Sequence, residues 1–277
     1  MRGTFTGVGV GPGDPGLMTV KAVRAVMECD VIAIPVSDST LKEPVYEQAQ
    51  KARQDAADGA SGVCGRCREY LEKCVAYGIA VRACPEAGEK DHIFLPMPMI
   101  KEKDRLREIH DCDAEAVAKL LDQGADVVFL TLGDPTIYST CMYVHKRLKR
   151  RGYGTQIIPG IPSFCAAAAR LDIPLAENRQ EIHILPASYH IEDSLELPGT
   201  KVLMKAGRKM DEVKNLLLKK EVDAVMVENC GMENEKLYFG AREIPEQAGY
   251  YSLLIVKETR EDGNKSVSDS QRGGTEG

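Results

Sequence analysis

Short apolar runs alternate along this chain with longer amphipathic segments, and this alternation restricts the fold more than any other feature of the sequence. Runs this short are typical of buried parallel strands, whereas apolar residues that recur every three or four positions indicate helices. Strands are expected at residues 4–10, 31–36, 92–95 and 127–132. Helices are expected at residues 20–29, 45–57 and 113–123. This rhythm predicts an α/β fold, with a mostly parallel sheet and helices on its faces.

The second half of the chain predicts a second α/β unit. After a helix over residues 136–150, strands are expected at residues 156–158, 182–185, 201–204, 223–227 and 252–257, the last two with antiparallel character. The chain would then form two α/β domains, residues 1–135 and 136–257, with a boundary between residues 135 and 155. Residues 258–277 are polar and rich in Gly and Ser, which predicts a disordered tail.

Composition argues against several classes of function. A net charge of −6, only five Phe and no Trp disfavour a nucleic-acid partner, which needs surplus Lys and Arg and rings for base stacking. No run approaches the roughly 18 apolar residues of a membrane span, and no apolar signal region begins the chain. We therefore expect a cytoplasmic protein with no membrane partner. Nine cysteines, an odd number, favour reduced thiols or metal ligands over disulfides.

The first strand leads into a glycine-rich loop, GVGVGPGDPG at residues 7–16. Three of its glycines match the G-x-G-x-x-G spacing of dinucleotide-binding folds: Gly11, Gly13 and Gly16. Asp38 lies about where a ribose-binding acid would fall. However, Pro12 and Pro15 remove N–H groups from the turn where a pyrophosphate needs several donors. The loop favours close approach of a ligand without phosphate, and a tight turn with no ligand is the alternative.

A second strand runs into a similar turn, VVFLTLGDPTIYST at residues 127–140. Gly-Asp-Pro closes this strand at residues 133–135, as it does in the first loop at residues 13–15. Ligands of open α/β sheets collect at the carboxyl ends of the strands, so two such turns are expected to flank one cleft. Asp134 would accept hydrogen bonds from a ligand, or cap the helix that follows.

A third segment, IIPGIPSFCAAAARLDIPL at residues 157–175, also joins a strand to a helix. Ser163 is placed to cap this helix, and the small residues 165–169 allow a close approach of backbone or of a flat ligand. Tight helix packing without a ligand is the alternative.

Together these three segments resemble the tetrapyrrole methylase family. Within it the chain is most similar to the methyltransferases that act on carbon 20 of precorrin-2 and cobalt-precorrin-2. Further segments that carry this likeness are FLPMPM at residues 94–99, HILPAS at 183–188 and VENCGMENEKLY at 227–238. The resemblance implies two α/β domains, a homodimer, a tetrapyrrole substrate in cobalamin biosynthesis, and S-adenosylmethionine (SAM) in the cleft between the domains. SAM has no phosphate, so the missing amides at Pro12 and Pro15 would not matter.

The resemblance also implies roles for particular residues. Contacts to SAM are implied for Gly11, Pro12, Gly13, Leu132, Gly133, Asp134, Ile137, Ser163 and Met204. Pro162 departs from the family, in which Ser or Thr is common at this place. No catalytic acid or base is implied, because methyl transfer from a sulfonium depends mainly on alignment. Basic side chains should bind the acetate and propionate arms of the substrate, and the candidates are Arg170, Lys205, Arg208 and Lys209.

Residues 51–91 interrupt the resemblance and contain four of the nine cysteines, namely Cys64, Cys67, Cys74 and Cys84. Four thiols with a Cys-x-x-Cys pair suggest a zinc site or an iron–sulfur cluster. The alternative is packing, because Cys67, Tyr70, Leu71 and Cys74 follow helical spacing and would face a small core.

Three other functions stay open at this point. The chain could methylate another tetrapyrrole carbon, or a diphthine-like protein substrate. The Gly11, Gly13 and Gly16 spacing is compatible with a nicotinamide-dependent oxidoreductase, and the cysteine-rich segment with a non-catalytic metal-binding protein.

Overall fold

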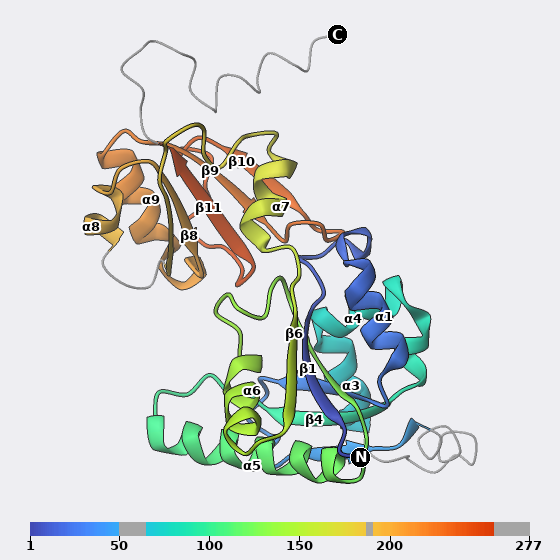
Figure 1. The fold of residues 1–277 in the computed structure, drawn as a ribbon. Helices are drawn as coiled ribbons and strands as arrows, with labels where there is room; N and C mark the ends of the chain where they lie inside the picture. The colour runs from blue at the N-terminus through green and yellow to red at the C-terminus, as the bar shows by residue number, and fades with distance from the viewer. Residues whose placement is uncertain (50–64, 187–190, 258–277) are drawn as a thin grey trace. The chain divides into compact units, whose positions relative to one another are not determined.

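The computed structural model describes residues 1–49, 65–186 and 191–257, which divide into two compact units, Met1–Pro162 and Ser163 onward (Figure 1). The boundary lies later than the sequence predicted. The strand expected to begin the second domain instead pairs with the first strand of the chain, so it completes the first sheet. The tail predicted at residues 258–277 lies outside the described residues.

The first unit contains a six-stranded sheet. Its strands are β1 (Thr4–Gly9), β2 (Val31–Val36), β3 (Val45–Glu47), β4 (Asp91–Pro96), β5 (Val127–Thr131) and β6 (Gly154–Ile158). They lie in the order β3-β4-β2-β5-β1-β6, and every pairing is parallel except that of β3 with β4. The mostly parallel sheet is confirmed. The helix predicted from residue 45 is wrong at its start, because residues 45–47 form the antiparallel edge strand.

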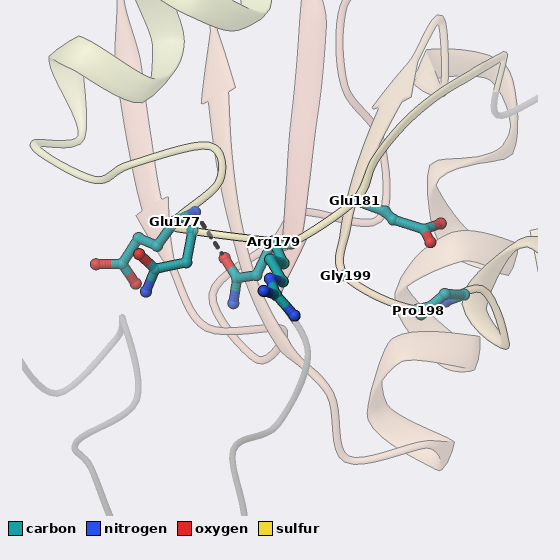
Figure 2. Close-up of a pocket in the computed structure, with 7 residues that line it drawn as sticks. Glu177, Arg179, Glu181, Pro198 and Gly199 are labelled. Carbon is teal, nitrogen blue, oxygen red and sulfur yellow. Dashed lines mark hydrogen bonds between the residues drawn. The ribbon is translucent and has the colours of Figure 1, made fainter.

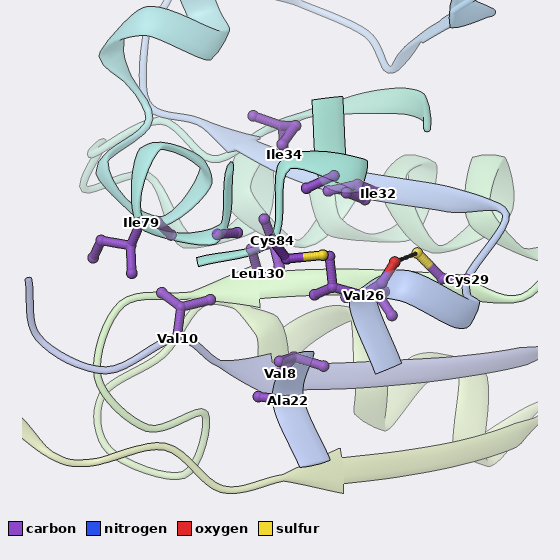
Figure 3. Packing of buried hydrophobic residues seen from close by; sticks show 14 of the residues in the cluster. Val8, Val10, Ala22, Val26, Cys29, Ile32, Ile34, Ile79, Cys84 and Leu130 are labelled. Atoms are coloured by element: carbon purple, nitrogen blue, oxygen red, sulfur yellow. Dashed lines mark hydrogen bonds between the residues drawn. The ribbon is translucent and has the colours of Figure 1, made fainter. Parts of the chain in front are cut away.

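Helices cover both faces of this sheet. One face carries α1 (Val20–Glu28), α3 (Gly65–Lys73) and α4 (Val75–Ala83), and the other carries α5 (Lys103–Asp122) and α6 (Cys141–Arg150). Side chains alternate along β2, with Ile32 and Ile34 in the first core and Val31 and Ala33 in the second. Figure 3 shows the first core, where side chains of β1 and β5 meet those of α1 and α4.

Two helix boundaries differ from the sequence prediction. Residues 113–123 were expected to be a separate helix, but they are the end of the longer α5, which is followed by Gly124 at a φ of +93°. The helix expected from residue 136 begins at Cys141, because residues 136–140 form a turn. This turn leaves the residues after β5 free of helical geometry.

The second unit contains a five-stranded sheet. Its strands are β7 (Ile182–Pro186), β8 (Thr200–Met204), β9 (Asp223–Glu228), β10 (Lys236–Phe239) and β11 (Ser252–Lys257), in the order β10-β9-β11-β8-β7. Only β7 and β8 are parallel, and β9 pairs antiparallel with β11 as predicted. The helices α8 (Ile191–Leu195) and α9 (Met210–Lys219) pack on one face, and α7 (Ser163–Arg170) contacts β11 on the other (Figure 1). Among the described residues, no helix is both long and apolar enough to cross a membrane.

Candidate functional site

The two Gly-Pro-rich turns of the first unit lie side by side, because β1 and β5 are neighbours in the sheet. Beyond the strands, the Gly11 N–H donates to the Gly133 carbonyl at 3.3 Å and the Gly133 N–H donates to the Gly11 carbonyl at 2.8 Å. Both glycines have positive φ, 79° and 71°, a conformation that glycine adopts without strain. The two turns therefore lie at the same edge of the sheet, and the cleft that they were expected to flank stays a prediction.

A third strand end joins this edge through close backbone contact. A Cβ atom on Gly160, which follows β6, would lie 2.1 Å from the Gly133 carbonyl oxygen. A Cβ atom on Gly9 would lie 2.5 Å from the Gly160 nitrogen. No side chain fits at such distances, so only glycine allows the ends of β1, β5 and β6 to approach in this way. Sequence analysis missed Gly9 and Gly160, and the signal that would have found Gly160 is the Pro-Gly pair directly after a strand.

Asp134 holds this edge together. One carboxylate oxygen, Oδ1, accepts hydrogen bonds from the Thr136 N–H at 2.8 Å and from the Thr136 hydroxyl, and the other, Oδ2, accepts from the Gly160 N–H at 3.0 Å. The residue is only 7% exposed. The prediction that Asp134 caps the following helix is wrong, since α6 begins at Cys141 and the Cys141 N–H is bonded by the Ser139 hydroxyl. The carboxylate instead joins the loop after β5 to the loop after β6.

The amides at the end of the first loop bond within their own turns. The Gly16 N–H donates to the Asp14 carboxylate at 2.8 Å, and the Leu17 and Met18 amides donate to carbonyls of residues 14 and 15. A three-residue 3-10 turn, η1 (Pro15–Leu17), contains Gly16 and separates Gly11 and Gly13 from α1, whose first turn is capped by Thr19. In dinucleotide folds the pyrophosphate instead meets the N-terminus of a helix that directly follows the glycines. This loop therefore does not have the form of a phosphate cradle.

The remaining predicted residues of the first unit surround these turns. Gly11, Pro12 and Gly13 are buried, whereas Leu132 and Ile137 are half-buried. Leu132 and Ile137 therefore offer partly exposed apolar surface beside the glycine edge, which is the place where Gly9, Gly11, Gly133 and Gly160 meet. Tyr138, which follows them, is 48% exposed and has a φ of 50°, a conformation that is uncommon for a residue with a large side chain.

Two predicted residues belong to the second unit and are described within it. Ser163 begins α7 and is half-buried. Met204 ends β8, where it pairs with Leu253 of β11. Lys205 comes next with a φ of 60°, and Gly207 follows so closely packed that a Cβ there would lie 2.7 Å from the Gly249 carbonyl oxygen. The end of β8 is thus another turn fixed by close backbone contact.

The basic residues predicted to bind substrate carboxylates differ in their surroundings. Arg170 forms an ion pair with Glu235, so its charge is already partly balanced. Lys209 pairs with Glu212 at 3.3 Å on the surface. Partial burial lowers the pKa of Lys205. Arg208 lies in a short 3-10 turn, η3 (Gly207–Lys209). Of the four, Lys205 combines an unusual backbone conformation with a perturbed pKa.

The cysteine-rich segment packs as a small helical core. Cys67 and Tyr70 of α3 are buried in the first core, and Leu71 and Cys74 pack against it. Burial raises the pKa of the Cys74 and Cys84 thiols, and the Cys84 thiol donates to Glu86 at 3.2 Å. Cys64 lies outside the described residues. Within residues 65–186, 191–257 and 1–49, no three His, Cys, Asp or Glu side chains are grouped as metal ligands. These observations favour the packing alternative over the predicted zinc or iron–sulfur site.

The second unit also has a surface hollow, lined by residues 177–181 together with Pro198 and Gly199 (Figure 2). Glu177, Arg179 and Glu181 lie around it, and the Glu177 N–H is bonded to the Gln180 side chain at 3.1 Å. None of the predicted site residues lines this hollow. We assign it no part in the candidate site.

Comparison with known proteins identifies the class to which this fold and these turns belong. The family model of the Tetrapyrrole (Corrin/Porphyrin) Methylases matches residues 4–244, and the chain belongs to this family. It is 32% identical over 254 residues to a protein of Methanocaldococcus jannaschii named probable cobalt-precorrin-2 C(20)-methyltransferase, covering 91% of this chain and 94% of that relative. It is 29% identical over 259 residues to a precorrin-2 C(20)-methyltransferase of Sinorhizobium sp, covering 92% and 95% of the two chains.

Solved structures show the same fold. The uroporphyrin-III C-methyl transferase from Thermus thermophilus, solved as a complex with S-adenyl homocysteine, superposes with a TM-score of 0.60. Its sequence is 18% identical, and the superposition covers 92% of this chain and 98% of that one. The two-sheet α/β architecture predicted from the sequence is thereby confirmed.

Proposed function

We propose that this chain is a SAM-dependent C-methyltransferase that methylates carbon 20 of precorrin-2 or cobalt-precorrin-2 in cobalamin biosynthesis. The observation that carries the proposal is the likeness, over more than nine-tenths of both chains, to relatives named for methylation at this carbon. Both forms of the substrate occur among these names, so cobalt content is left to experiment. The comparisons give no support to the nicotinamide-dependent alternative.

We infer that SAM binds at the glycine edge of the first sheet. The proposed contacts are Gly11, Pro12, Gly13, Leu132, Gly133, Asp134 and Ile137 from the first unit, and Ser163 and Met204 from the second. Three features of the first unit support this. The edge has no side chains at Gly9 and Gly160, its first loop is poor in phosphate donors, and Leu132 and Ile137 add apolar surface.

The residues of the site would act by alignment. SAM, when bound, supplies a methyl group that its sulfonium already activates. The backbone at Gly11 and Gly133 is fixed by two mutual hydrogen bonds, and Asp134 fixes the loop after β5 to Gly160, so the edge is rigid before a ligand arrives. A rigid edge lowers the entropic cost of placing the methyl group opposite the attacking carbon. Among the basic candidates we propose Lys205 to bind a substrate carboxylate, because it lies in the constrained turn directly after Met204.

A methyl-transfer assay tests this proposal directly. Purified protein is incubated with SAM and with precorrin-2 or cobalt-precorrin-2 in parallel, and the product is analysed by mass spectrometry and NMR. Methylation at carbon 20 of at least one substrate is expected. Methylation at another carbon would move the protein to another specificity of the same family. Thermal stabilisation by NAD but not by SAM would contradict the proposal, because a ligand stabilises the state that binds it.

The homodimer and the cytoplasmic location implied above stay predictions. Sedimentation equilibrium of the pure protein tests the first, and cell fractionation tests the second.

A further inference from the structure

The helices α3 and α4 fall in the segment that interrupts the family resemblance, and the proposed function has not yet given them a role. In the structure, α4 packs against α1, β5 and the η1 turn that follows the glycine loop. Its buried residues Ala76, Ile79 and Ala80 share a core with Val10 and Leu130, which lie next to the two Gly-Pro-rich turns. Figure 3 shows Ile79 beside Val10 and Leu130. The helix is thus part of the support for the glycine edge.

One side chain of α4 reaches the glycine loop itself. The Arg82 Nη2 atom donates to the Gly13 carbonyl at 3.1 Å, and its Nε atom donates to the Gly78 carbonyl one turn back in α4 at 3.3 Å. The guanidinium therefore holds a loop carbonyl and its own helix together. Arg82 also lies in the last turn of α4, where a positive charge is favourable next to the carbonyl end of the helix.

The place of this hydrogen bond matters because of the residues around it. Gly13 lies between Pro12, which has no N–H to donate, and Asp14, whose side chain is occupied by the next turn. Gly13 has no side chain, so its backbone has more conformational freedom than that of other residues. A hydrogen bond from elsewhere in the chain would restrict this freedom. Arg82 supplies such a hydrogen bond from a distance of 69 residues along the sequence.

We propose that Arg82 is a positioning residue for the first SAM loop, and that α3 and α4 form the scaffold of this loop. The inference rests on the proposed function, because it assigns SAM to the loop that Arg82 holds. Arg82 does not need to touch SAM. It fixes the Gly13 carbonyl, and with it the path of the backbone from Gly11 to Asp14.

Steady-state kinetics and SAM binding of two variants and a matched control test the proposal. Arg82→Met removes the hydrogen bonds and keeps the apolar stem. Arg82→Lys keeps the charge and one donor group. Arg68→Met is the control, because Arg68 also lies in this helix pair but forms an exposed surface ion pair with Glu72.

We expect Arg82→Met to raise the Kd and the KM for SAM about three- to tenfold, with the KM for the tetrapyrrole and kcat at saturating SAM unchanged. Arg82→Lys should lie between Arg82→Met and wild type, and Arg68→Met should match wild type.

Hydrogen exchange supplies a second measurement. In Arg82→Lys, the amides of Gly16, Leu17 and Met18 should exchange faster than in wild type, because one donor group cannot bond the Gly13 and Gly78 carbonyls as the guanidinium does, and the turn is held less firmly. In Arg68→Met the exchange should not change. This measurement keeps the test decisive if Arg82→Met fails to fold.

Several outcomes would overturn the inference. SAM affinity and exchange that match wild type in both Arg82 variants would show that the loop needs no such support. A parallel rise in both KM values, or the same change in Arg68→Met, would show a general loosening of the fold instead. Failure of the wild-type protein to bind SAM would overturn the proposed function and the inference with it, whereas wild-type behaviour of the Arg82 variants overturns the inference alone.

Discussion

The triplet Gly-Asp-Pro occurs twice in this chain, at residues 13–15 and 133–135, and the two copies share a local structure but not a tertiary one. In each copy, one carboxylate oxygen of the Asp accepts a hydrogen bond at 2.8 Å from the amide two residues later. Asp14 is exposed and its carboxylate makes this local contact. Asp134 is 7% exposed, and its second oxygen accepts the Gly160 N–H.

The difference follows from the places of the two strands in the sheet. β1 lies between β5 and β6, so the ends of three strands meet where Asp134 is found. The local sequence determines the hydrogen bond to the amide two residues on, as it does in many Asp-containing turns. The order of the strands determines whether the same carboxylate also joins two loops. The second turn therefore holds the edge together, and the first is the turn that we propose to offer its backbone to a ligand.

The largest expected effect comes from filling the gap between the three strand ends. Gly160→Ala would place a Cβ atom 2.1 Å from the Gly133 carbonyl oxygen and 2.8 Å from backbone carbon atoms of Gly9. We expect a loss of about 3–5 kcal/mol in the free energy of unfolding and loss of SAM binding. Chemical denaturation and SAM titration measure both.

Gly16→Ala in the first turn is the matched control. Its Cβ would lie 3.2 Å from the Asp14 carboxylate. Because the Asp14 side chain is exposed, it is able to move away from this Cβ. We expect stability within about 1 kcal/mol of wild type. An equal loss of stability in Gly160→Ala and Gly16→Ala would show that the two turns do not differ in how tightly they are packed.

The second largest expected effect is the difference in stability loss between Asp134→Ala and Asp14→Ala. Asp134→Ala leaves the Gly160 N–H and the Thr136 donors without their acceptor, which we expect to cost about 2–4 kcal/mol of stability. Asp14→Ala removes a cap of the short η1 turn and should cost less than about 1 kcal/mol. Urea denaturation of both variants measures the difference. Similar losses would show that the contact to Gly160 contributes nothing beyond the local turn.

A second buried carboxylate, in α5, sharpens the comparison because it lacks the donors that Asp134 has. Asp113 is fully buried, neither of its oxygens has a hydrogen-bond partner among the described residues, and burial raises its pKa to about 8. The positive charge of Arg147 acts in the opposite direction but is the weaker influence.

The direction of the pH effect follows from this raised pKa. The folded state binds the Asp113 proton more tightly than the unfolded state, so this group stabilises the protein at low pH and the stabilisation is lost between about pH 4 and pH 8, at up to about 1.4 kcal/mol per pH unit. Asp113→Asn should remove that part of the pH dependence. Denaturation of this variant and of the wild type at pH 5, 6, 7 and 8, chosen as roughly unit steps across this interval, tests this. A wild-type slope in Asp113→Asn would contradict it.

The sequence predicted the parts of the fold that depend on local pattern. The strand at residues 31–36 was predicted with its observed limits, and the strands beginning at residues 4 and 127 end one residue earlier than predicted. Both Gly-Asp-Pro turns were found because a buried strand precedes each. The alternation of short apolar runs with amphipathic segments predicted the α/β class, and the resemblance to a family then supplied the proposed cofactor and substrate, which no single motif would have given.

The larger failures involve partners far away in the chain, whereas the helix limits at residues 113 and 136 were missed locally. Residues 45–47 became a strand because β4, more than 40 residues later, offers an edge to pair with. The strand after residue 153 joined the first sheet because β1 had an unpaired edge. The contacts of Asp134 with Gly160, and of Arg82 with Gly13, are of the same kind. Neither periodicity nor spacing carries information on such pairings, so sequence analysis identified the turns but not what holds them.

A structure of the protein in complex with S-adenosylhomocysteine tests the central claim most directly, since the claim concerns one place on the first sheet. The account predicts the ligand against the backbone of Gly11–Gly13 and Gly133, with Leu132 and Ile137 on its apolar side. A ligand that binds elsewhere and leaves both turns uncovered would contradict it.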